Sequence, residues 1–168
     1  MDMDMRYIKI SLGIFLVLAS SRLIPHPPNF TSLIALSFYV PVILGLRFIP
    51  ALIIAFVLTD LIIGYHFGTH WTWGSVVLIG FISIFLNSNF ITRIGGALIG
   101  AVIFFIITNF GVWVSGMYEQ SWAGFAECYI LALPFFGYSM VSTLLFSLLI
   151  EAVYKFGHNK LRELSVIK

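Results

Sequence analysis

Polar side chains that could bind a ligand or perform chemistry gather in three short stretches of an otherwise apolar chain. These stretches are RLIPHPPNFTSL (22–33), TDLIIGYHFGTHWTW (59–73) and TNFGVWVSGMYEQSWAGFAECY (108–129). They hold charged groups, amides, imidazoles and all four tryptophans of the chain. Such a mixture is typical of a small-molecule binding pocket. The candidate ligand-binding residues are Arg22, His26, Asn29, Asp60, His66, Asn109, Trp113, Tyr118 and Trp122.

Catalysis and metal binding receive little support from the residue spacing. His66 and His70 stand four residues apart, as two metal ligands on one helix face would. Glycines at 64 and 68 argue against a regular helix there. Cys128 is the only cysteine, so we expect it to be a packing residue rather than part of a metal cluster. No nucleophile–base pair and no phosphate-binding loop can be assembled. We therefore expect no enzyme, no metal site and no cofactor.

The composition indicates an integral membrane protein. Of the 168 residues, 60 % are hydrophobic, 17 % are aromatic and only 10 % are charged, whereas about a quarter of the residues in a soluble domain are charged. That leaves too little polar surface to cover a globule in water. The net charge of +2 is too small to favour a nucleic acid as partner, so the expected partner is the lipid bilayer.

The apolar runs predict an all-α bundle of six transmembrane helices in a single domain, residues 1–168. The runs cover about 8–24, 31–46, 48–65, 73–90, 94–115 and 127–156, close to the length that crosses about 30 Å of hydrocarbon. The acidic start MDMDM is a poor signal peptide, so the first run is interpreted as a retained span. With both termini cytoplasmic, eight of the nine Lys and Arg residues fall on the inner side and only Arg22 falls outside.

Asp60 carries the strongest electrostatic constraint in this arrangement. It lies about one helical turn inside the outer end of the third span. An ionised carboxylate in a bilayer costs at least about 2.5 kcal/mol unless it is paired or hydrated. Arg22 ends the first span at a similar depth, so we expect the two residues to form an ion pair. The same pair could brace a binding pocket, and a direct contact of Asp60 with a ligand stays open.

The stretch 22–33 predicts a stiff loop over an outward-facing pocket. Its three prolines restrict the backbone, so its polar side chains project from a fixed loop towards spans three, five and six. The tryptophans fit either the wall of that pocket or an interfacial aromatic belt. Asn109 fits either a ligand contact or a hydrogen bond between helices. In the fifth span, Gly96 and Gly100 indicate close helix packing.

The segments SRLIPHPPNFT, TDLIIGYH and TNFGVWVSGMY…GFAECYILALPFF resemble those of an uncharacterised family of small bacterial membrane proteins. The general plan is similar to the S components of energy-coupling-factor vitamin transporters, six-helix proteins whose outward-facing vitamin site is roofed by the first loop. This resemblance implies a multi-pass protein of the bacterial cytoplasmic membrane, with a transmembrane coupling subunit and ATPases as partners. The first span, SLGIFLVLASS, lacks the Ala-x-x-x-Ala docking motif of those components, so a solitary transporter or another partner stays open.

Two functions compete at this point. The first is binding or transport of a vitamin-like micronutrient under the 22–33 loop, with the candidate residues above as contacts. The second is a structural or accessory subunit of a larger membrane complex, in which the same polar cluster would be a protein interface. The small-residue stripes and the lack of a soluble domain suit this second function.

Overall fold

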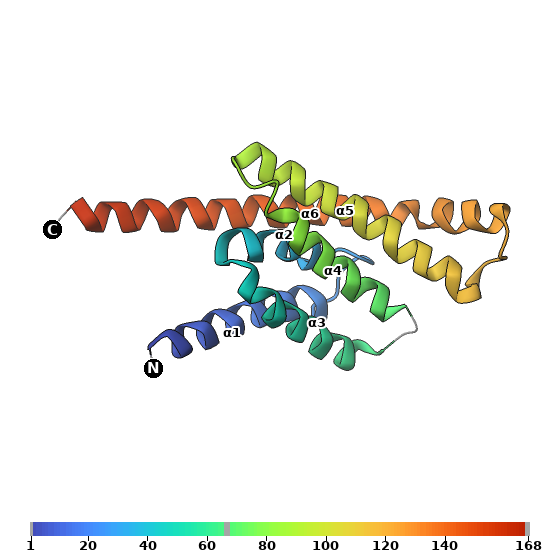
Figure 1. The fold of residues 1–168 in the computed structure, drawn as a ribbon, viewed down its shortest axis with the longest axis horizontal. Coiled ribbons are helices and arrows are strands. Elements are labelled where there is room, and N and C mark those ends of the chain that lie inside the picture. Colours follow the sequence, from blue (N-terminus) through green and yellow to red (C-terminus); the bar gives the residue numbers. More distant parts are fainter. Residues whose placement is uncertain (1, 66–67, 167–168) are drawn as a thin grey trace.

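The chain folds into helices joined by short connections (Figure 1). The computed structural model describes residues 2–65 and 68–166, with side chains for 5–65 and 68–156. The prediction of an all-α chain with six α-helices is confirmed for the described residues. The elements are α1 (Asp2–Leu23), α2 (Leu33–Leu44), the 3-10 turn η1 (Leu46–Phe48), α3 (Ile49–Ile63), α4 (Thr69–Ser83), α5 (Phe90–Val112), the π-helical turn η2 (Trp113–Met117) and α6 (Trp122–Val166).

Three segments of the described chain are long and apolar enough to cross a membrane, namely Leu46–Ile63, Phe90–Met117 and Trp122–Phe156. These segments suggest a multi-pass membrane protein. The expectation of six full-length spans is met only in part. Helices α2 and α4 contain 12 and 15 residues, which corresponds to about 18 and 22 Å. Both fall short of the roughly 30 Å of a hydrocarbon core.

The turn between α4 and α5 lies earlier than the apolar runs indicate. The predicted fourth span reaches residue 90, whereas α4 ends at Ser83 and α5 already begins at Phe90. Asn89 sets this boundary, because its side chain accepts a hydrogen bond of 3.1 Å from the Thr92 N–H. The Thr92 hydroxyl in turn accepts one of 2.9 Å from the Asn89 N–H. This reciprocal capping box starts a helix inside an apolar run.

Helix α2 forms the centre of the bundle. All residues from Leu33 to Pro41 are buried, and α2 contacts each of the other five α-helices. A helix that is apolar on every side is stable when other helices surround it. One core cluster joins α2 to α1, α3 and α4, and a second joins it to α4 and α5.

Glycines bring α5 close to its neighbours, as the sequence predicts. A Cβ atom on Gly96 would lie 2.6 Å from the ring of Phe38 in α2. A Cβ atom on Gly100 would lie 3.0 Å from the side chain of Ile79 in α4. Neither distance leaves room for a methyl group without movement of the neighbour.

Gly96→Ala is therefore expected to lower the free energy of unfolding by about 1–3 kcal/mol, the usual effect of overpacking a close contact. The change can be measured by circular dichroism during titration with sodium dodecyl sulfate. Gly95→Ala is the matched control, since a Cβ atom there meets nothing within 4 Å. Equal midpoints for the two variants would show that the close approach of α5 and α2 is not needed for stability.

Helices α5 and α6 extend beyond the rest of the bundle. In Figure 1 their connected ends project to the right, past the ends of α3 and α4. Helix α6 begins at Trp122 rather than at residue 127, because the Ser121 hydroxyl accepts a hydrogen bond of 3.2 Å from the Gly124 N–H. We call residues 105–138 the α5–α6 hairpin.

Candidate functional site

A cavity of about 230 Å³ lies at the end of the bundle where residues 24–32 connect α1 to α2. We call it the loop-end cavity. Every α-helix contributes to its wall, and so does the connecting loop. The lining residues are Arg22, His26, Asn29, Thr31, Leu33, Ile34, Phe56, Asp60, Ile63, Thr72, Phe104 and Ser139. Four candidate residues from the sequence, Arg22, His26, Asn29 and Asp60, thus lie around one cavity.

The predicted ion pair between Arg22 and Asp60 is confirmed. Arg22 Nη2 donates a hydrogen bond of 2.6 Å to Asp60 Oδ1. The other carboxylate oxygen, Oδ2, accepts one of 2.7 Å from Trp73 Nε1. Asp60 is 4 % exposed, so both oxygens are satisfied where water has little access. The Asp60 carboxylate thus holds α1, α3 and α4 together at the cavity wall, and Trp73 supplies a hydrogen-bond donor that the sequence did not predict.

The Arg22 guanidinium is held on three sides. Its Nη1 atom donates to the Thr59 hydroxyl and, at 3.3 Å, to the Phe56 carbonyl oxygen. Its Cζ atom also lies 4.5 Å from the centroid of the Phe56 ring, within the range of a cation–π contact. All three contacts come from α3, so Arg22 fixes the end of α1 against the end of α3.

The loop over the cavity is closed by hydrogen bonds at its two ends. The hydroxyls of Ser21 and Ser32 lie 2.7 Å apart, and Ser21 Oγ accepts a hydrogen bond of 3.1 Å from the Ser32 N–H. Between them, the Phe30 N–H donates to the Pro27 carbonyl oxygen at 3.0 Å, which forms a turn. Asn29 lies in that turn with a φ of 61°, a left-handed conformation that Asn tolerates better than most residues.

The polar groups of the loop differ in their availability to a ligand. The two ring nitrogens of His26 face backbone carbonyl oxygens of Pro27 at 2.7 Å and Arg22 at 3.2 Å. Asn29 is exposed, and its side-chain amide makes no hydrogen bond with the described residues. The Asn29 backbone carbonyl instead accepts a bond of 3.4 Å from the Ser142 hydroxyl of α6. The Asn29 amide is therefore more available to a ligand than the His26 ring.

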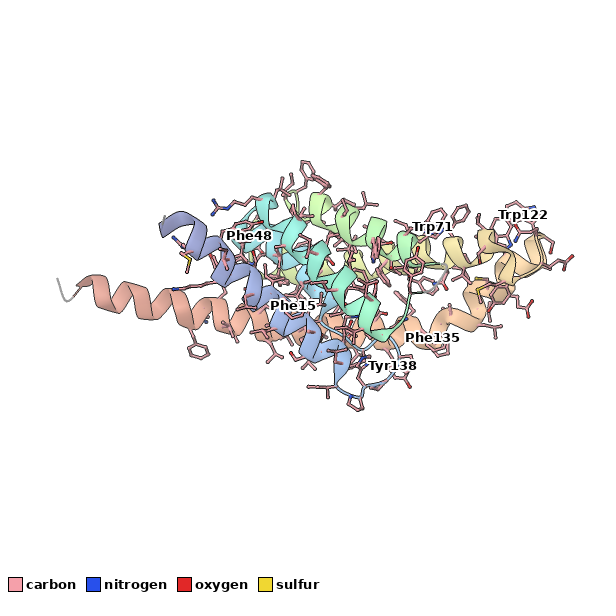
Figure 2. All side chains as sticks on the ribbon, turned by 90° about the horizontal axis from the view of Figure 1, so that it is seen from below. Phe15, Phe48, Trp71, Trp122, Phe135 and Tyr138 are labelled. Atoms are coloured by element: carbon pink, nitrogen blue, oxygen red, sulfur yellow. The ribbon has the colours of Figure 1, made fainter. Side chains whose placement is uncertain are left out.

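The remaining candidates do not line the loop-end cavity. Nine residues separate Trp113 from Phe104, the cavity residue of α5, which is roughly 13 Å along a helix. Seventeen residues separate Trp122 from Ser139, roughly 25 Å along α6. Figure 2 shows Trp122 at the tip of the α5–α6 hairpin, well away from Tyr138, the neighbour of Ser139. These candidate residues do not converge on the loop-end cavity, because α5 and α6 extend past the ends of the other helices.

Local contacts account for these distant candidates. The Asn109 side chain donates to the Phe105 carbonyl oxygen one turn earlier, at 2.7 Å. Trp113 Nε1 donates to the Glu119 carbonyl oxygen at 3.1 Å, and the Trp113 ring packs against Phe125. Trp122 is 86 % exposed. The Tyr118 residue is half-buried, whereas His66 lies outside the described residues.

Two other expectations concern Cys128 and metal binding. Cys128 is 2 % exposed, and its Sγ lies 3.4 Å from the Asn109 carbonyl oxygen between α5 and α6, so its packing role is confirmed. Among the described side chains, no group of three or more His, Cys, Asp or Glu residues could hold a metal ion.

A second buried ion pair lies near the opposite end of the bundle. Arg93 of α5 donates through Nε and Nη2 to the two carboxylate oxygens of Glu151 in α6, at 2.6 and 2.7 Å. Both residues border an open pocket of about 570 Å³. We call this end of the bundle the Arg93 end. The sequence showed both charges but gave no sign of their pairing, because 58 residues separate them.

Sequence reasoning also missed Thr72, Phe104 and Ser139 as cavity residues. Single hydroxyls and a phenylalanine inside apolar helices carry no signal that separates a cavity wall from ordinary packing. The exception is Ser139, which is 3 % exposed and stands four residues before Thr143 on the same face of α6. Phe104 carries no comparable signal.

A comparison with known protein families gives a match that covers nearly the whole helical unit. The model of a family of unknown function, DUF6580, matches residues 3–164. The chain belongs to the DUF6580 family. Both ion pairs and the whole loop-end cavity of this DUF6580 protein lie within the matched residues. No curated protein and no solved structure matches the chain.

Proposed function

We propose that this DUF6580 protein is a multi-pass membrane protein that binds a compact polar solute in the loop-end cavity and takes part in its transport. The observation that carries this proposal is the cavity itself, whose wall draws on every α-helix and is fixed by the Arg22–Asp60 pair. A few placed polar groups in a largely apolar wall are typical of ligand sites. Because all the helices contribute, a movement of any one would change the cavity, as transport requires.

The chemistry of the wall suggests a solute without net charge. The charges of Arg22 and Asp60 cancel, and both are already engaged with protein groups. What remains for a ligand is the Asn29 amide, the Thr31 hydroxyl as a donor and the Thr72 hydroxyl as an acceptor, since Thr31 already accepts from the Leu33 N–H and Thr72 already donates to the Thr69 carbonyl oxygen. None of these groups carries a charge. The volume of about 230 Å³ lies below the 300–1,000 Å³ of pockets for drug-sized molecules. A small vitamin-like micronutrient fits this size better than a corrinoid.

The proposed topology places the cavity on the outer face of the cytoplasmic membrane. Both termini would be cytoplasmic, which leaves Arg22 as the sole Lys or Arg of the chain on the outer side. Helices α2 and α4 would lie within the bilayer without crossing its full thickness. The loop 24–32 would then roof an outward-facing site, in a plan similar to that of vitamin-transporter S components. A coupling subunit with ATPases, or transport without them, is compatible with this arrangement.

The proposal is tested by mass spectrometry of small molecules that the purified protein releases on denaturation. The informative variant is Asn29→Gly, because glycine accepts the φ of 61° and removes only the amide. We expect one compound to be enriched in the wild type and about tenfold depleted in Asn29→Gly, which corresponds to one hydrogen bond of about 1.4 kcal/mol. Trp122→Ala is the control and should retain the compound, since Trp122 does not line the cavity. No enriched compound, or equal amounts in both variants, would contradict the proposal.

The alternative function, an accessory subunit of a membrane complex, draws on the α5–α6 hairpin. Its tip presents Met117 and Trp122 with 74 and 86 % of their surface exposed, next to the contacting rings of Trp113, Phe125 and Tyr129. Exposed aromatic patches of this kind often mark interfaces. If this function holds, Trp122→Ala should change the mobility of the native complex on blue-native gels of mildly solubilised membranes. Under the transport proposal, that mobility stays the same.

A further inference from the structure

A row of buried polar side chains runs along α6 from the loop-end cavity to the Arg93 end. Ser139, Thr143, Ser147 and Glu151 follow one another at intervals of four residues, so each lies one turn beyond the last. Their exposures are 3, 0, 0 and 6 %, which shows that all four face the inside of the bundle. Over twelve residues the row covers about 18 Å. We call these four residues, together with Tyr39 of α2, the polar seam.

Several hydroxyls of the seam have no hydrogen-bond partner. These are the hydroxyls of Tyr39, Thr143 and Ser147, although all three are buried. The buried hydroxyls of Ser37 and Ser83 donate to backbone carbonyls of their own helices, whereas outside the seam the Ser11 hydroxyl also lacks a partner among the described residues. An unsatisfied buried hydroxyl costs about 1–3 kcal/mol. Three of them in one region of a native fold indicate that another species supplies the partners.

The two ends of the seam open on pockets. At one end, Ser139 lines the loop-end cavity, and the neighbouring Ser142 bonds to the loop through the Asn29 carbonyl. At the other end, Glu151 borders the open pocket of about 570 Å³. Near this second end, the Tyr39 hydroxyl lies close to both the Glu151 carboxylate and the Ser147 hydroxyl, without a hydrogen bond of standard geometry to either. A bridging water at this end would supply the partner that the Tyr39 and Ser147 hydroxyls lack.

We propose that water fills the polar seam and forms a hydrated route between the loop-end cavity and the Arg93–Glu151 pair. Water is the species that fits, because each buried water commonly makes two to four hydrogen bonds to such groups. A metal cation fits less well, since both carboxylate oxygens of Glu151 are engaged by Arg93. If the proposed transport function holds, on which this step rests, a compact polar solute leaving the cavity follows the same route.

Hydroxyl-radical labelling with mass spectrometry tests the hydration directly, on the full chain in vesicles of phosphatidylethanolamine and phosphatidylglycerol. Radicals form from water next to the side chain, so a buried aromatic ring is labelled where water reaches it. Phe38 is the matched internal control, because it adjoins Tyr39 in α2 and both are 1 % exposed. After each rate is divided by the intrinsic reactivity of its ring toward hydroxyl radical, we expect Tyr39 to be labelled several times faster than Phe38. Equal rates for the two rings would overturn the proposal.

A double variant shows whether the seam hydroxyls hold the water. Thr143→Val with Ser147→Ala removes two hydroxyls that lack protein partners, so folding is expected to be retained or improved. Tyr39 labelling should then fall to the rate of Phe38; an unchanged Tyr39 rate would count against the seam as the water site. The outcome of this test can be told apart from the outcome of the test of the proposed function. A dry seam with a retained solute refutes the hydrated route alone, and a wet seam without a solute refutes the binding function alone.

Discussion

Asp60→Ala is expected to lower the free energy of unfolding by about 3–5 kcal/mol, one of the largest effects of a single substitution in this protein. The change leaves the Arg22 guanidinium largely buried without its carboxylate, with 14 % of that side chain exposed. It also removes the acceptor of the Trp73 indole N–H. Circular dichroism during titration with sodium dodecyl sulfate gives the free energy, with wild type and variant in the same micelles.

The double variant Asp60→Ala, Arg22→Leu shows how much of that loss arises from the unpaired charge. Most of the stability should return, because no buried charge is left. Trp73→Phe is the matched control, because it removes only the hydrogen bond from the indole N–H to Asp60 Oδ2. It should lower the free energy of unfolding by only about 1–2 kcal/mol. If the double variant is as unstable as Asp60→Ala, the pair is not what stabilises this end of the bundle. Restored folding without restored solute retention would make the carboxylate a ligand contact.

Glu151→Ala is expected to destabilise the protein by a similar amount, about 3–5 kcal/mol. The bidentate pair with Arg93 joins α5 to α6 at the Arg93 end, and the Glu151 side chain is 7 % exposed. Removing the carboxylate leaves the guanidinium beside the Tyr154 ring, whose centroid lies 5.8 Å from the Arg93 Cζ atom. The same detergent titration measures the loss, and Lys155→Ala serves as the control at the exposed, neighbouring position.

Arg93→Lys tests the geometry of this pair. Lysine keeps the charge but cannot make two parallel bonds to one carboxylate, so we expect a smaller loss, of about 1–2 kcal/mol. A loss equal to that of Glu151→Ala would mean that the planar guanidinium, not the charge, determines the stability of this contact. In folded samples, neither variant should change solute retention in the loop-end cavity, since neither residue lines it.

The Arg22–Asp60 pair was predictable because a bilayer leaves few choices. In a chain with so few charges, an Asp inside an apolar run needs a partner, and one Arg lay at a similar depth. The Arg93–Glu151 pair follows the same physics, but each residue lies near an end of its predicted apolar run, where a charge is expected to reach water without a partner. The sequence therefore gave no reason to join them.

Helix number followed from the apolar runs, but helix ends did not. Asn89 and Ser121 start α5 and α6 through side-chain hydrogen bonds to the first turn, and a hydropathy pattern does not register such polar caps. The resulting helix lengths determine which candidate residues line the loop-end cavity. Because α5 and α6 extend past the other helices, Trp113 and Trp122 lie far from a cavity that includes Arg22 and Asp60. Residues that the hydropathy profile places on the same side of the membrane therefore do not all lie close together in the fold.

By itself, the sequence determined the helical class, the membrane-like composition, the stiff loop at 22–33 and the close packing at Gly96. These features follow from local rules, namely apolar run length, proline geometry and residue size. Only the tertiary structure decided which polar groups share the loop-end cavity and that Trp73 donates the second hydrogen bond to Asp60. It also decided that unpartnered hydroxyls of α2 and α6 form one seam. Those outcomes depend on the rotation and offset of helices about their neighbours, which the packing of the whole bundle fixes.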